Sequence, residues 1–577
     1  SEMCIRDSPW SGHLGLRSHQ SLLKIIDKNK STLLFTNTRN QSERWFQCLR
    51  YYNPEISDSI AIHHGSLDKT HRKSVEEGVK NGSIKWVVCT SSLDLGVDFQ
   101  PVDQIVQIGS AKNLARLIQR AGRSAHNPGG KSKIIFMPTN ALELLEVSAM
   151  RRILKNEVTE SINLPELSID VLLQHLVSLA CGPGFDPIEE REHIRNCWSF
   201  RNLKDEDWKW CLDFLEYGGK CLKAYPKFKK IHKEFFKGKE FKYFVKDKTI
   251  IKTHKFNIGT ITSDNYLNVK YINGKQLGNL EENFASKLKI GDVFFFSGKM
   301  LEFIKIREMN IYVKRSNKKS SLVPAWIGGQ IPISDLLSVS IRQEIDICEH
   351  LNDSEKFINK ELLALKPILD RQRKISKIPN KRELLIEIYK TKKYKSLFVF
   401  TLEGKFANEG IAFLWALRFA KRSKTTFSIT ANDFGFSLTT YQDFDFSLIV
   451  DNLSDLIKTN NLENDLANAI NFSELTKRKF KNIAQISGLV NNSPIKSKTS
   501  SQLNISSGLL FDVFSKYEKD HLLIKQAERE AIKYELESDR IKMSLNRIAE
   551  LKIIINKIEE PSPFAFPLLV ERISNTI

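Results

Sequence analysis

The strongest constraint on the fold of this chain is a regular alternation of short apolar runs with amphipathic helical segments over residues 9–154. Strands that alternate with helices at this spacing are typical of a parallel sheet covered by helices on both faces. The predicted strands are Thr32–Thr36, Trp86–Thr90, Gln104–Ile108 and Lys133–Met137. The predicted helices are Gln41–Tyr51, Thr70–Lys80, Asn113–Ala121 and Leu142–Leu154. The sequence therefore predicts an α/β domain at this end of the chain.

One of these predicted strands leads into the stretch VVCTSSLDLGVDF at Val87–Phe99. The loop after such a strand lies at the carboxyl edge of the sheet, where folds of this kind bind ligands. Thr90 is expected to contact a phosphate backbone, and Gly96 allows close approach of a ligand. Asp98 is expected to accept a hydrogen bond from a ribose hydroxyl or to pair with an arginine.

A second stretch, QRAGRSAH, ends a predicted helix and carries Gln119, Arg120 and Arg123. The two arginines are three residues apart and can therefore face the same way. Two guanidinium groups directed at one point suit a triphosphate, because arginine bridges the charged oxygens of a transferred phosphoryl group. The alternative interpretation is a pair of surface salt bridges. The position after a strand–helix unit favours nucleotide chemistry.

Two further segments of the α/β region carry side chains suited to phosphate. LLFTNTR contributes Thr36, Asn37 and Arg39, and HHGSL contributes His64 and Gly65. Such groups can hold a nucleic-acid backbone without reading the bases, and the amides of a glycine turn can face a phosphate. Each segment alone is compatible with ordinary loop structure, so the prediction depends on their order along the chain.

The segment AHNPGGKS at Ala125–Ser132 is similar to a relaxed phosphate-binding loop. A functional loop follows a strand and opens a helix whose amino end faces the phosphates. This segment instead follows a helix, contains Pro128 and leads into a strand, so we do not interpret it as a nucleotide loop. No Asp-Glu-x-His or Asp-Glu-x-Asp motif is found either. These residues thus include arginines suited to ATP but no loop that would bind its phosphates.

Composition narrows the choice of partners and ligands. A formal net charge of +20 favours polyanions, although the Asn-, Lys- and Ile-rich composition is also typical of proteins from AT-rich genomes. The eight cysteines form no C-x-x-C pair, so we predict free thiols and no metal site, although four of them cluster with His193: Cys181, Cys197, Cys211 and Cys221. No apolar run is long enough for a membrane span, no secretory signal is evident, and the predicted location is the cytoplasm.

The chain divides into four predicted parts: residues 1–8, which match nothing that follows and resemble a cloning scar, then 9–158, 159–252 and 253–577. In the third part, Asp170–Ala180 and Asp205–Leu215 are predicted helices, the second stopped by Gly218-Gly219. Helices followed by a short β segment favour a winged helix. From Thr253 the alternating runs IGTIT, NYLNVKYING, VFFFSGKMLEFIKI and NIYVKR predict strands.

The region after Ile333 is expected to be mixed. A loose linker is predicted at Asn491–Ser507. A long, charged surface helix is predicted over Asp520–Glu559.

The ordered segments LLFTNTR, HHGSL, TSSLDLGVDF and QRAGRSAH resemble the second RecA-like domain of superfamily 2 helicases. PWSGHLG near the start is similar to the large-helicase-related (Lhr) group, in particular its ligase-associated DEXH-box branch. Downstream segments agree: GPGFDP, GNLEENFASKLKIGDVFFFSGKMLE, VPAWIGG, ITANDFGFSL and PSPFAFPLLVERI. The resemblance implies a RecA-like domain, a winged helix and a large C-terminal domain of mixed β-rich and helical structure.

The resemblance also implies an ATP-dependent, 3′-to-5′ single-stranded DNA translocase that acts in DNA repair. ATP and Mg²⁺ would be its cofactors, held mainly by a first RecA-like domain that these residues do not include. DNA duplexes and RNA:DNA duplexes would be its substrates. A DNA ligase and a phosphoesterase encoded nearby would be its partners, and no membrane is involved.

The resemblance assigns roles residue by residue. It places Gln119, Arg120 and Arg123 as catalytic groups and Gly96 and Asp98 at the nucleotide. The predicted DNA-binding residues are Thr36, Asn37, Arg39, His64, Gly65, Thr90, Ile258 and Trp326. Trp326 would stack on a base, although a core tryptophan is the alternative, and Ile258 would act as a wedge between strands.

Two other functions stay open at this point. The chain is alternatively a non-catalytic nucleic-acid-binding remnant, or a helicase directed at RNA, because phosphate contacts do not distinguish RNA from DNA. The sequence resembles the C-terminal portion of a truncated gene model, and the isolated chain is predicted to be inactive as an ATPase.

Overall fold

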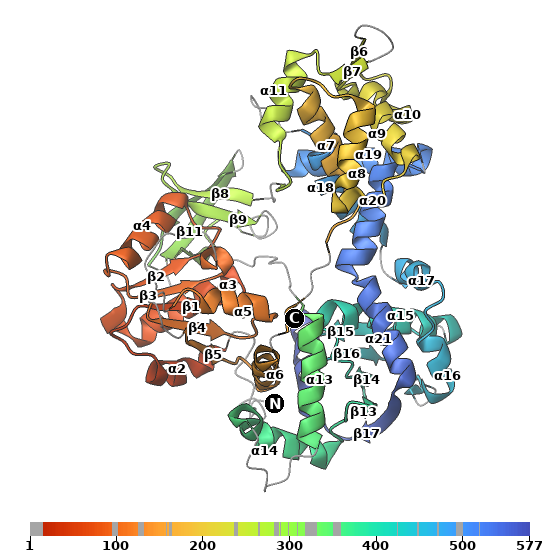
Figure 1. The fold of residues 1–577 in the computed structure, drawn as a ribbon. Coiled ribbons are helices and arrows are strands. Elements are labelled where there is room, and N and C mark those ends of the chain that lie inside the picture. Colours follow the sequence, from red (N-terminus) through yellow and green to blue (C-terminus); the bar gives the residue numbers. More distant parts are fainter. Residues whose placement is uncertain are drawn as a thin grey trace.

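The computed structural model describes most of the chain, and every structural statement below concerns these residues. They are residues 15–94, 102–124, 132–156, 158–160, 164–235, 241–262, 266–281, 288, 290–297, 299–307, 310–317, 332–349, 359–423, 425–446, 449–469, 472–491, 500–518 and 520–576. Figure 1 shows three bodies: an α/β body with a second sheet above it, a mostly helical body, and a mixed body that contains the C-terminal region.

A five-stranded parallel sheet forms the α/β body, in the order β2-β3-β1-β4-β5. Its strands are β1 (Thr32–Phe35), β2 (Ile60–His63), β3 (Trp86–Cys89), β4 (Gln104–Ile108) and β5 (Ile134–Met137). Helices cover it: α2 (His19–Ile25), α3 (Arg39–Tyr52), α4 (Lys69–Lys80), α5 (Leu114–Ala121) and α6 (Glu143–Lys155). The predicted α/β fold is confirmed, and the four predicted strands and four predicted helices are present; β2 and α2 were not predicted.

The second sheet is antiparallel except for one parallel pair, and its order is β10-β11-β12-β8-β9. Its strands are β8 (Tyr266–Tyr271), β9 (Gln276–Glu281), β10 (Val293–Phe296), β11 (Lys299–Arg307) and β12 (Asn310–Arg315). The prediction that strands begin at Thr253 is wrong. Helix α11 (Lys248–Asn257) continues past that residue, and 258–262 form no strand. The predicted boundary at 252–253 therefore falls inside α11.

The two sheets share one hydrophobic core, to which Trp86 and Val106 contribute from the parallel sheet and Phe296 and Val313 from the second. Backbone bonds also join them, because the amide of Asn279 donates to the carbonyl of Ser66 at 2.7 Å. The second sheet is thus packed directly on the HHGSL segment of the α/β body.

The helical body contains a winged helix, as predicted. Its elements are α7 (Ile169–Ala180), α8 (Pro187–Asn196), α9 (Asp205–Tyr217), β6 (His232–Phe235), β7 (Phe241–Phe244) and α11. Helix α9 ends at Gly218, whose φ of 80° favours glycine. Three later helices fill the same core: α18 (Phe472–Ile486), α19 (Ser500–Tyr517) and α20 (Leu522–Glu530). The core of the winged helix is therefore completed by residues about 300 positions downstream.

The third body holds a mixed sheet in the order β15-β16-β14-β13-β17. Its strands are β13 (Glu383–Lys390), β14 (Lys395–Val399), β15 (Ser428–Ala431), β16 (Phe436–Thr440) and β17 (Lys552–Ile558). Its helices are α13 (Asp335–Glu349), α14 (Lys360–Ile375), α15 (Lys405–Ser423), α16 (Ile449–Leu456), α17 (Leu462–Ala469), α21 (Ser538–Glu550) and α22 (Phe566–Thr576).

The predicted continuous helix over Asp520–Glu559 is wrong. Helix α20 ends at Glu530, a π-helical turn follows, and Glu537 has a left-handed φ of 48° before α21 begins. Residues 552–558 then form β17, because the run of isoleucines packs alternately against two cores of this body. The predicted linker at Asn491–Ser507 is also partly wrong, since α19 begins at Ser500; residues 492–499 lie outside the described residues.

The α/β body is joined to the third body through α6, which packs against α13 and α14 in a shared core (Figure 1). Beside this core, Lys112 Nζ lies 2.5 Å from a carboxylate oxygen of Asp433. Burial by itself lowers the pKa of Lys112, but the charges of Asp433 and Glu146 outweigh burial and raise that pKa above the ordinary lysine value. The pair is therefore ionised and ties the end of β4 to the turn between β15 and β16.

The contact between the two sheets gives a testable prediction at Gly278, which has a φ of +149°. A Cβ there would lie 2.2 Å from the carbonyl oxygen of Ser66. Gly278→Ala should therefore lower the first thermal unfolding transition. The matched control is Gly274→Ala, because Gly274 has a φ of +84° and nothing within 4 Å of its Cβ position. The control should cost about 1–2 kcal/mol of backbone strain, and Gly278→Ala about 1–3 kcal/mol more from overpacking. Equal transition temperatures would contradict the close packing of the sheets.

Candidate nucleotide- and DNA-facing site

Three predicted motifs meet at one edge of the parallel sheet. Thr36 follows β1, His64 follows β2 and Thr90 follows β3, and these three strands are neighbours in the sheet. Because all the strands run in the same direction, their carboxyl ends lie at the same edge. Backbone bonds hold the ends in register, with the amide of Thr36 donating to Cys89 at 2.8 Å and that of Thr90 to His63 at 3.3 Å.

Three of the predicted DNA-contacting residues have buried side chains that bond within the protein or pack in it. The Thr36 hydroxyl is fully buried and donates to the Cys89 carbonyl at 3.1 Å. His64 is also fully buried, and its Nε2 lies 3.1 Å from a carboxylate oxygen of Glu43. The same Glu43 oxygen accepts the amide of Ser297 at 2.8 Å. Thr90 is buried as well. These buried side chains therefore support the edge of the sheet from inside the protein.

The accessible residues at this edge are Asn37, Arg39 and Gly65. Asn37 is exposed, and its side-chain amide donates to the Ser110 carbonyl at 2.7 Å, which joins the ends of β1 and β4. Arg39 is half-buried. A Cβ on Gly65 would lie 3.9 Å from Nη2 of Arg39. The absence of a side chain at residue 65 therefore leaves room beside the Arg39 guanidinium.

Asp94 connects the two motif stretches that the sequence singled out. Its carboxylate oxygen Oδ1 accepts Nε of Arg120 at 2.9 Å, in a pair whose side chains are 9% and 1% exposed. Arg120 Nη1 also donates to the side chain of Gln107, and its guanidinium lies over the ring of Phe35 with Cζ 4.7 Å from the ring centroid. The sequence singled out Asp98 in this loop and missed Asp94. The only feature of the sequence that points to Asp94 is an acidic residue five positions after the end of β3.

Arg123 differs from Arg120 in its surroundings. It is half-buried, and its Nε and Nη2 donate to the backbone carbonyl of Asp94 at 3.1 and 2.9 Å. Both arginines thus face the same point, as their spacing predicts, but that point is Asp94. Gln119 is exposed on the same helix. Gln119 and Arg123 can therefore meet a ligand from solvent, whereas Arg120 is enclosed.

His63, next to the buried His64, is held in its neutral form. Its Nδ1 lies 2.8 Å from the hydroxyl of Ser92, and its Nε2 lies 3.1 Å from a carboxylate oxygen of Glu76. Burial lowers the pKa of His63 to about 4, although its hydrogen bond to the Glu76 carboxylate opposes this shift. The neutral imidazole therefore links the end of β2 to the loop after β3 through the hydroxyl of Ser92.

Gly96, Asp98 and Trp326 lie outside the described residues. Ile258 lies on the helical body, directly after α11, and is 55% exposed. Gln174 of α7 fixes this turn, because its side-chain amide accepts the Gly259 amide at 3.0 Å and donates to the Gly259 carbonyl at 3.1 Å. Sequence reasoning missed this role, because Gln174 stands in an ordinary amphipathic helix.

Among the described residues, no group of three or more His, Cys, Asp or Glu side chains is placed to hold a metal ion. All the cysteines that the structure describes are free thiols, including Cys181, Cys197, Cys211 and Cys221. Nor does this part of the chain contain a helix with the length and hydropathy to cross a membrane.

Three family models match the chain in sequence order. Residues 18–127 match the helicase conserved C-terminal domain, residues 152–323 the winged helix domain of the large helicase-related protein, and residues 378–565 the DEAD/H associated domain. With the parallel sheet and its motif-bearing edge, these matches show that the chain is built from domains of the helicase class. The chain belongs to the large helicase-related (Lhr) family of superfamily 2 helicases.

Similar proteins agree with this assignment. The chain is 29% identical to the ATP-dependent helicase Lhr-Core of Methanocaldococcus jannaschii, over 98% of this chain and 66% of that protein. It is 29% identical to the ATP-dependent helicase Lhr-Core protein 2 of Thermococcus barophilus, over 97% and 66%. The chain thus spans about two thirds of the length of these relatives. The solved structure of Mycobacterium smegmatis helicase Lhr, bound to ssDNA and AMP-PNP, has the same fold, with a TM-score of 0.71, 20% identity and coverage of 95% of this chain and 68% of that one.

The different surroundings of the two arginines give a prediction about stability. Arg120→Ala removes one partner of a buried ion pair and should cost about 3–5 kcal/mol. Arg123→Ala removes hydrogen bonds to a half-buried carbonyl and should cost about 1 kcal/mol. Urea unfolding of both variants, followed by tryptophan fluorescence, measures the difference. A loss of stability in Arg123→Ala as large as in Arg120→Ala would contradict the structural role of Arg120.

Proposed function

We propose that this chain is the part of an ATP-dependent DNA helicase that carries the second RecA-like domain and the accessory domains. The whole enzyme translocates 3′ to 5′ on single-stranded DNA and displaces a paired strand, as a DNA repair enzyme of the cytoplasm. The observation that carries this proposal is the meeting of three motifs at the carboxyl edge of β1, β2 and β3. Membership of a helicase family and the names of the similar proteins support it.

The backbone of a single strand would contact the accessible part of that edge. Asn37 and Arg39 supply donors, and Gly65 leaves room for a phosphate beside the arginine. Such contacts hold the backbone without reading the bases, which suits an enzyme that moves along any sequence. Thr36, His64 and Thr90 would act mainly by fixing this edge, because their side chains are buried.

The nucleotide would lie on the side of Gln119 and Arg123. Arg123 is the better candidate for contact with the transferred phosphoryl group, because its guanidinium is half-buried at the end of α5. Arg120 would position it through their common partner Asp94. Gly96 and Asp98 would complete this half of the site, while a first RecA-like domain would supply the phosphate loop and the Mg²⁺ ligands. ATP and Mg²⁺ together supply the phosphoryl chemistry.

Other parts of the proposal rest on the resemblance alone. Trp326 would stack on a base and Ile258 would separate the strands. The division into domains at 9–158, 159–252 and 253–577 belongs to the proposal, although α11 crosses the boundary at 252–253 and the second sheet starts at Tyr266. The ligase-associated branch, with a DNA ligase and a phosphoesterase as partners and DNA or RNA:DNA duplexes as substrates, is proposed on the same ground.

Binding of DNA is the first test. The 577-residue chain should bind a fluorescent single-stranded oligonucleotide, with log K falling by about 0.7 per neutralised phosphate for each tenfold rise in salt. Fluorescence anisotropy across a salt series measures this slope. Trp326→Ala should weaken binding by about 1–3 kcal/mol, whereas the control Trp198→Ala, at a half-exposed tryptophan on the helical body, should not. Absence of binding at low salt would overturn the proposal.

Hydrolysis of ATP is the second test. The chain on its own should release phosphate at close to the background rate, with or without single-stranded DNA, because its residues include arginines but no phosphate loop. Phosphate release is measured against a no-protein control. Robust DNA-stimulated hydrolysis by these 577 residues would show that the nucleotide site is complete within them, contrary to the proposal.

A further inference from the structure

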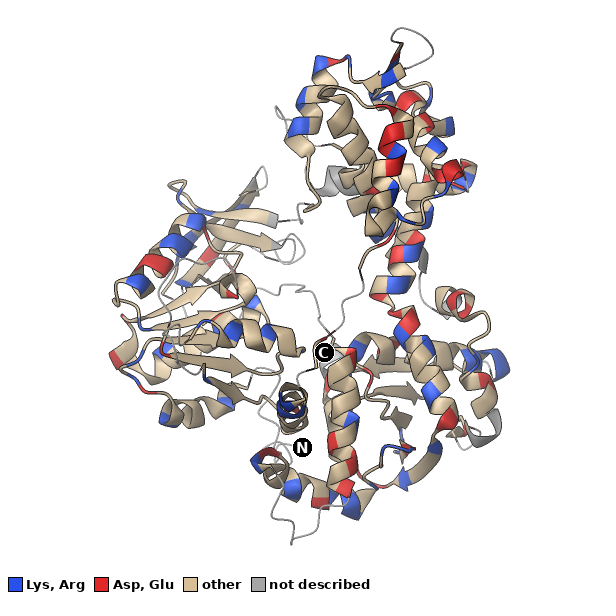
Figure 2. Cartoon of the chain, in the orientation of Figure 1, with Lys and Arg blue, Asp and Glu red and all other residues tan. Residues whose placement is uncertain are grey.

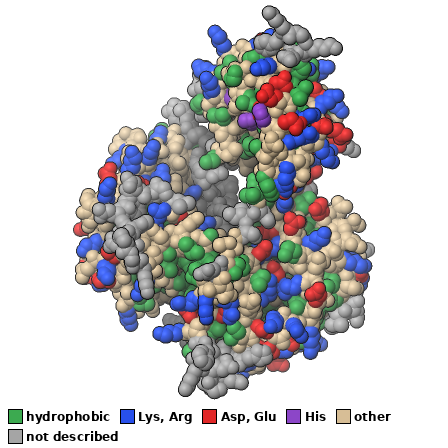
Figure 3. Space-filling view, in the orientation of Figure 1, with side chains coloured by type: hydrophobic (Ala, Val, Ile, Leu, Met, Phe, Trp, Pro, Cys, Tyr) green, Lys and Arg blue, Asp and Glu red, His purple; other side chains and the backbone are tan. Residues whose placement is uncertain are grey.

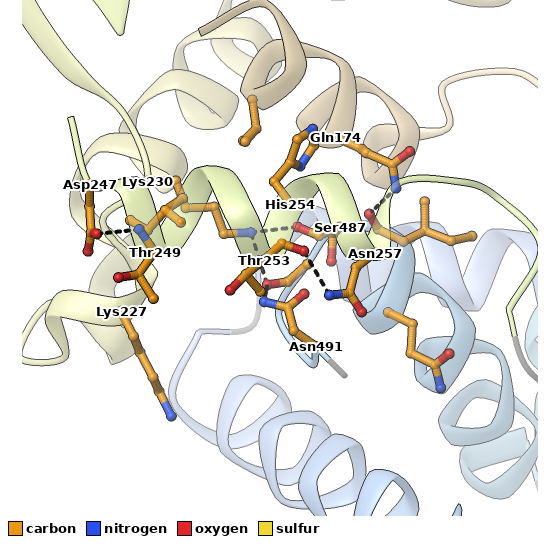
Figure 4. A pocket seen from close by; sticks show the side chains of 15 residues that line it. Gln174, Lys227, Lys230, Asp247, Thr249, Thr253, His254, Asn257, Ser487 and Asn491 are labelled. Atoms are coloured by element: carbon orange, nitrogen blue, oxygen red, sulfur yellow. Dashed lines mark hydrogen bonds between the residues drawn. The ribbon is translucent and has the colours of Figure 1, made fainter. Parts of the chain in front are cut away.

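Helix α11 of the helical body has two different faces. One face, which includes Thr249, Thr253 and Asn257, lines a cavity of about 190 Å³. Residues of α7 and of the turn after α18 also line this cavity, as Figure 4 shows. The opposite face points away from the body. The cavity-lining face of α11 is therefore directed toward the helical body.

Side-chain bonds hold this support in place. His254 of α11 bonds through Nε2 to the hydroxyl of Ser178 on α7 at 2.8 Å. Burial lowers the pKa of His254 to about 4, so the ring is neutral. Across the cavity, Lys230 Nζ donates to the carbonyls of Ser487 and Gly488 at 2.8 and 2.9 Å (Figure 4). At the end of α11, the Gln174 amide fixes Gly259. Through His254 and Gly259, the carboxyl-terminal part of α11 is thus bonded to α7.

The outer face of α11 carries a row of lysines. Lys248, Lys252 and Lys255 are spaced at i, i+4 and i+7, which places them on one side of the helix, and all three are exposed. Over seven residues the row extends about 10.5 Å. Within the described part of the chain, none of the three forms an ion pair. Figure 2 shows the resulting basic colour on α11, and Figure 3 shows Lys and Arg side chains along this border of the helical body.

Unpaired like charges at this spacing destabilise a helix by a few tenths of a kcal/mol per pair. A solvated surface would gain from an interspersed acid, and the one acid of this segment, Asp247, is used as the helix cap, accepting the Thr249 amide at 2.7 Å. The row therefore suits a ligand with regularly spaced negative charges.

Exposed apolar side chains follow directly after the lysine row. Phe256 is 56% exposed, Ile258 55% and Ile261 97%. Three large apolar side chains that are exposed within six residues mark a binding surface better than a solvated turn. A ligand that satisfies both features has a repeated negative charge and apolar faces beside it, and nucleic acid has both.

We propose that α11 is a second nucleic-acid site, which binds the backbone of the duplex arm of a tailed DNA through Lys248, Lys252 and Lys255. The inference rests on the proposed function for its class of ligand. The single-strand residues Asn37, Arg39 and Gly65 lie on the α/β body, whereas α11 belongs to the helical body (Figure 1). The apolar turn at residues 258–261 ends the helix, so the duplex on α11 would lead to the point where strands separate.

The test compares a duplex bearing a 3′ single-stranded tail with the tail alone, using the 577-residue chain and fluorescence anisotropy. The unchanged chain should bind the tailed duplex about tenfold more tightly than the tail. The triple variant Lys248→Ala/Lys252→Ala/Lys255→Ala should lose this preference and bind the tail as before. Its salt slope on the tailed duplex should be less steep by about 2–3, at roughly 0.9 per phosphate contact. A triple Lys→Arg variant keeps the charges and should keep the preference.

The matched control is Lys69→Ala/Lys73→Ala/Lys80→Ala, which removes three exposed lysines from α4 on the α/β body. It should leave the preference unchanged, and an equal loss in this variant would overturn the proposal by showing a general charge effect. Retention of the preference in the α11 variant would also overturn it. The proposal would also be overturned if the α11 variant kept its DNA binding and lost only binding to anionic phospholipid vesicles. If the unchanged chain binds neither DNA, the proposed function itself fails.

Discussion

The motif-bearing edge of the parallel sheet depends on one buried carboxylate, that of Asp94. Its side chain pairs with Arg120 inside the domain, and its backbone carbonyl accepts both donors of Arg123 at the surface. A carboxylate with this little exposure is stable only beside a charged partner. The loop after β3 and the end of α5 are therefore fixed relative to each other. In the proposed motor, this link would couple the loop after β3, proposed to face DNA, to Arg123, proposed to face the nucleotide.

The α/β body is not an independent unit in this fold. It shares one core with the second sheet, through Trp86 and Phe296 among others, and another core with α13 and α14 through α6. The buried pair of Lys112 and Asp433 reinforces the second contact at the end of β4. In the helical body, α18 to α20 complete the core of the winged helix. The first two of these cores tie the second sheet and the third body to the α/β body that carries the motifs.

Much of the parallel sheet could be predicted from sequence, because each strand is a short apolar run between helices of clear period. The prediction omits strand β2, because IAIH is only four residues long and its last residue, His63, together with His64 begins a segment interpreted as a glycine turn. The prediction of one helix over Asp520–Glu559 is wrong because charged residues obscure the alternating isoleucines of β17. Which arginine is buried could not be read from their spacing, because it depends on Asp94 and Gln107, which come from other elements. The roles of Glu43, Gln174 and Asp433 likewise arise from contacts between distant segments.

Hydrogen–deuterium exchange of the 577-residue chain, with and without a single-stranded oligonucleotide, tests the central claim most directly. The claim is that the carboxyl ends of β1, β2 and β3 form one DNA-facing edge. DNA should then slow exchange in the peptides that contain residues 36–39, 64–65 and 90 together, while exchange in the sheet of the third body is unchanged. Binding of the oligonucleotide with protection confined to other regions would contradict it.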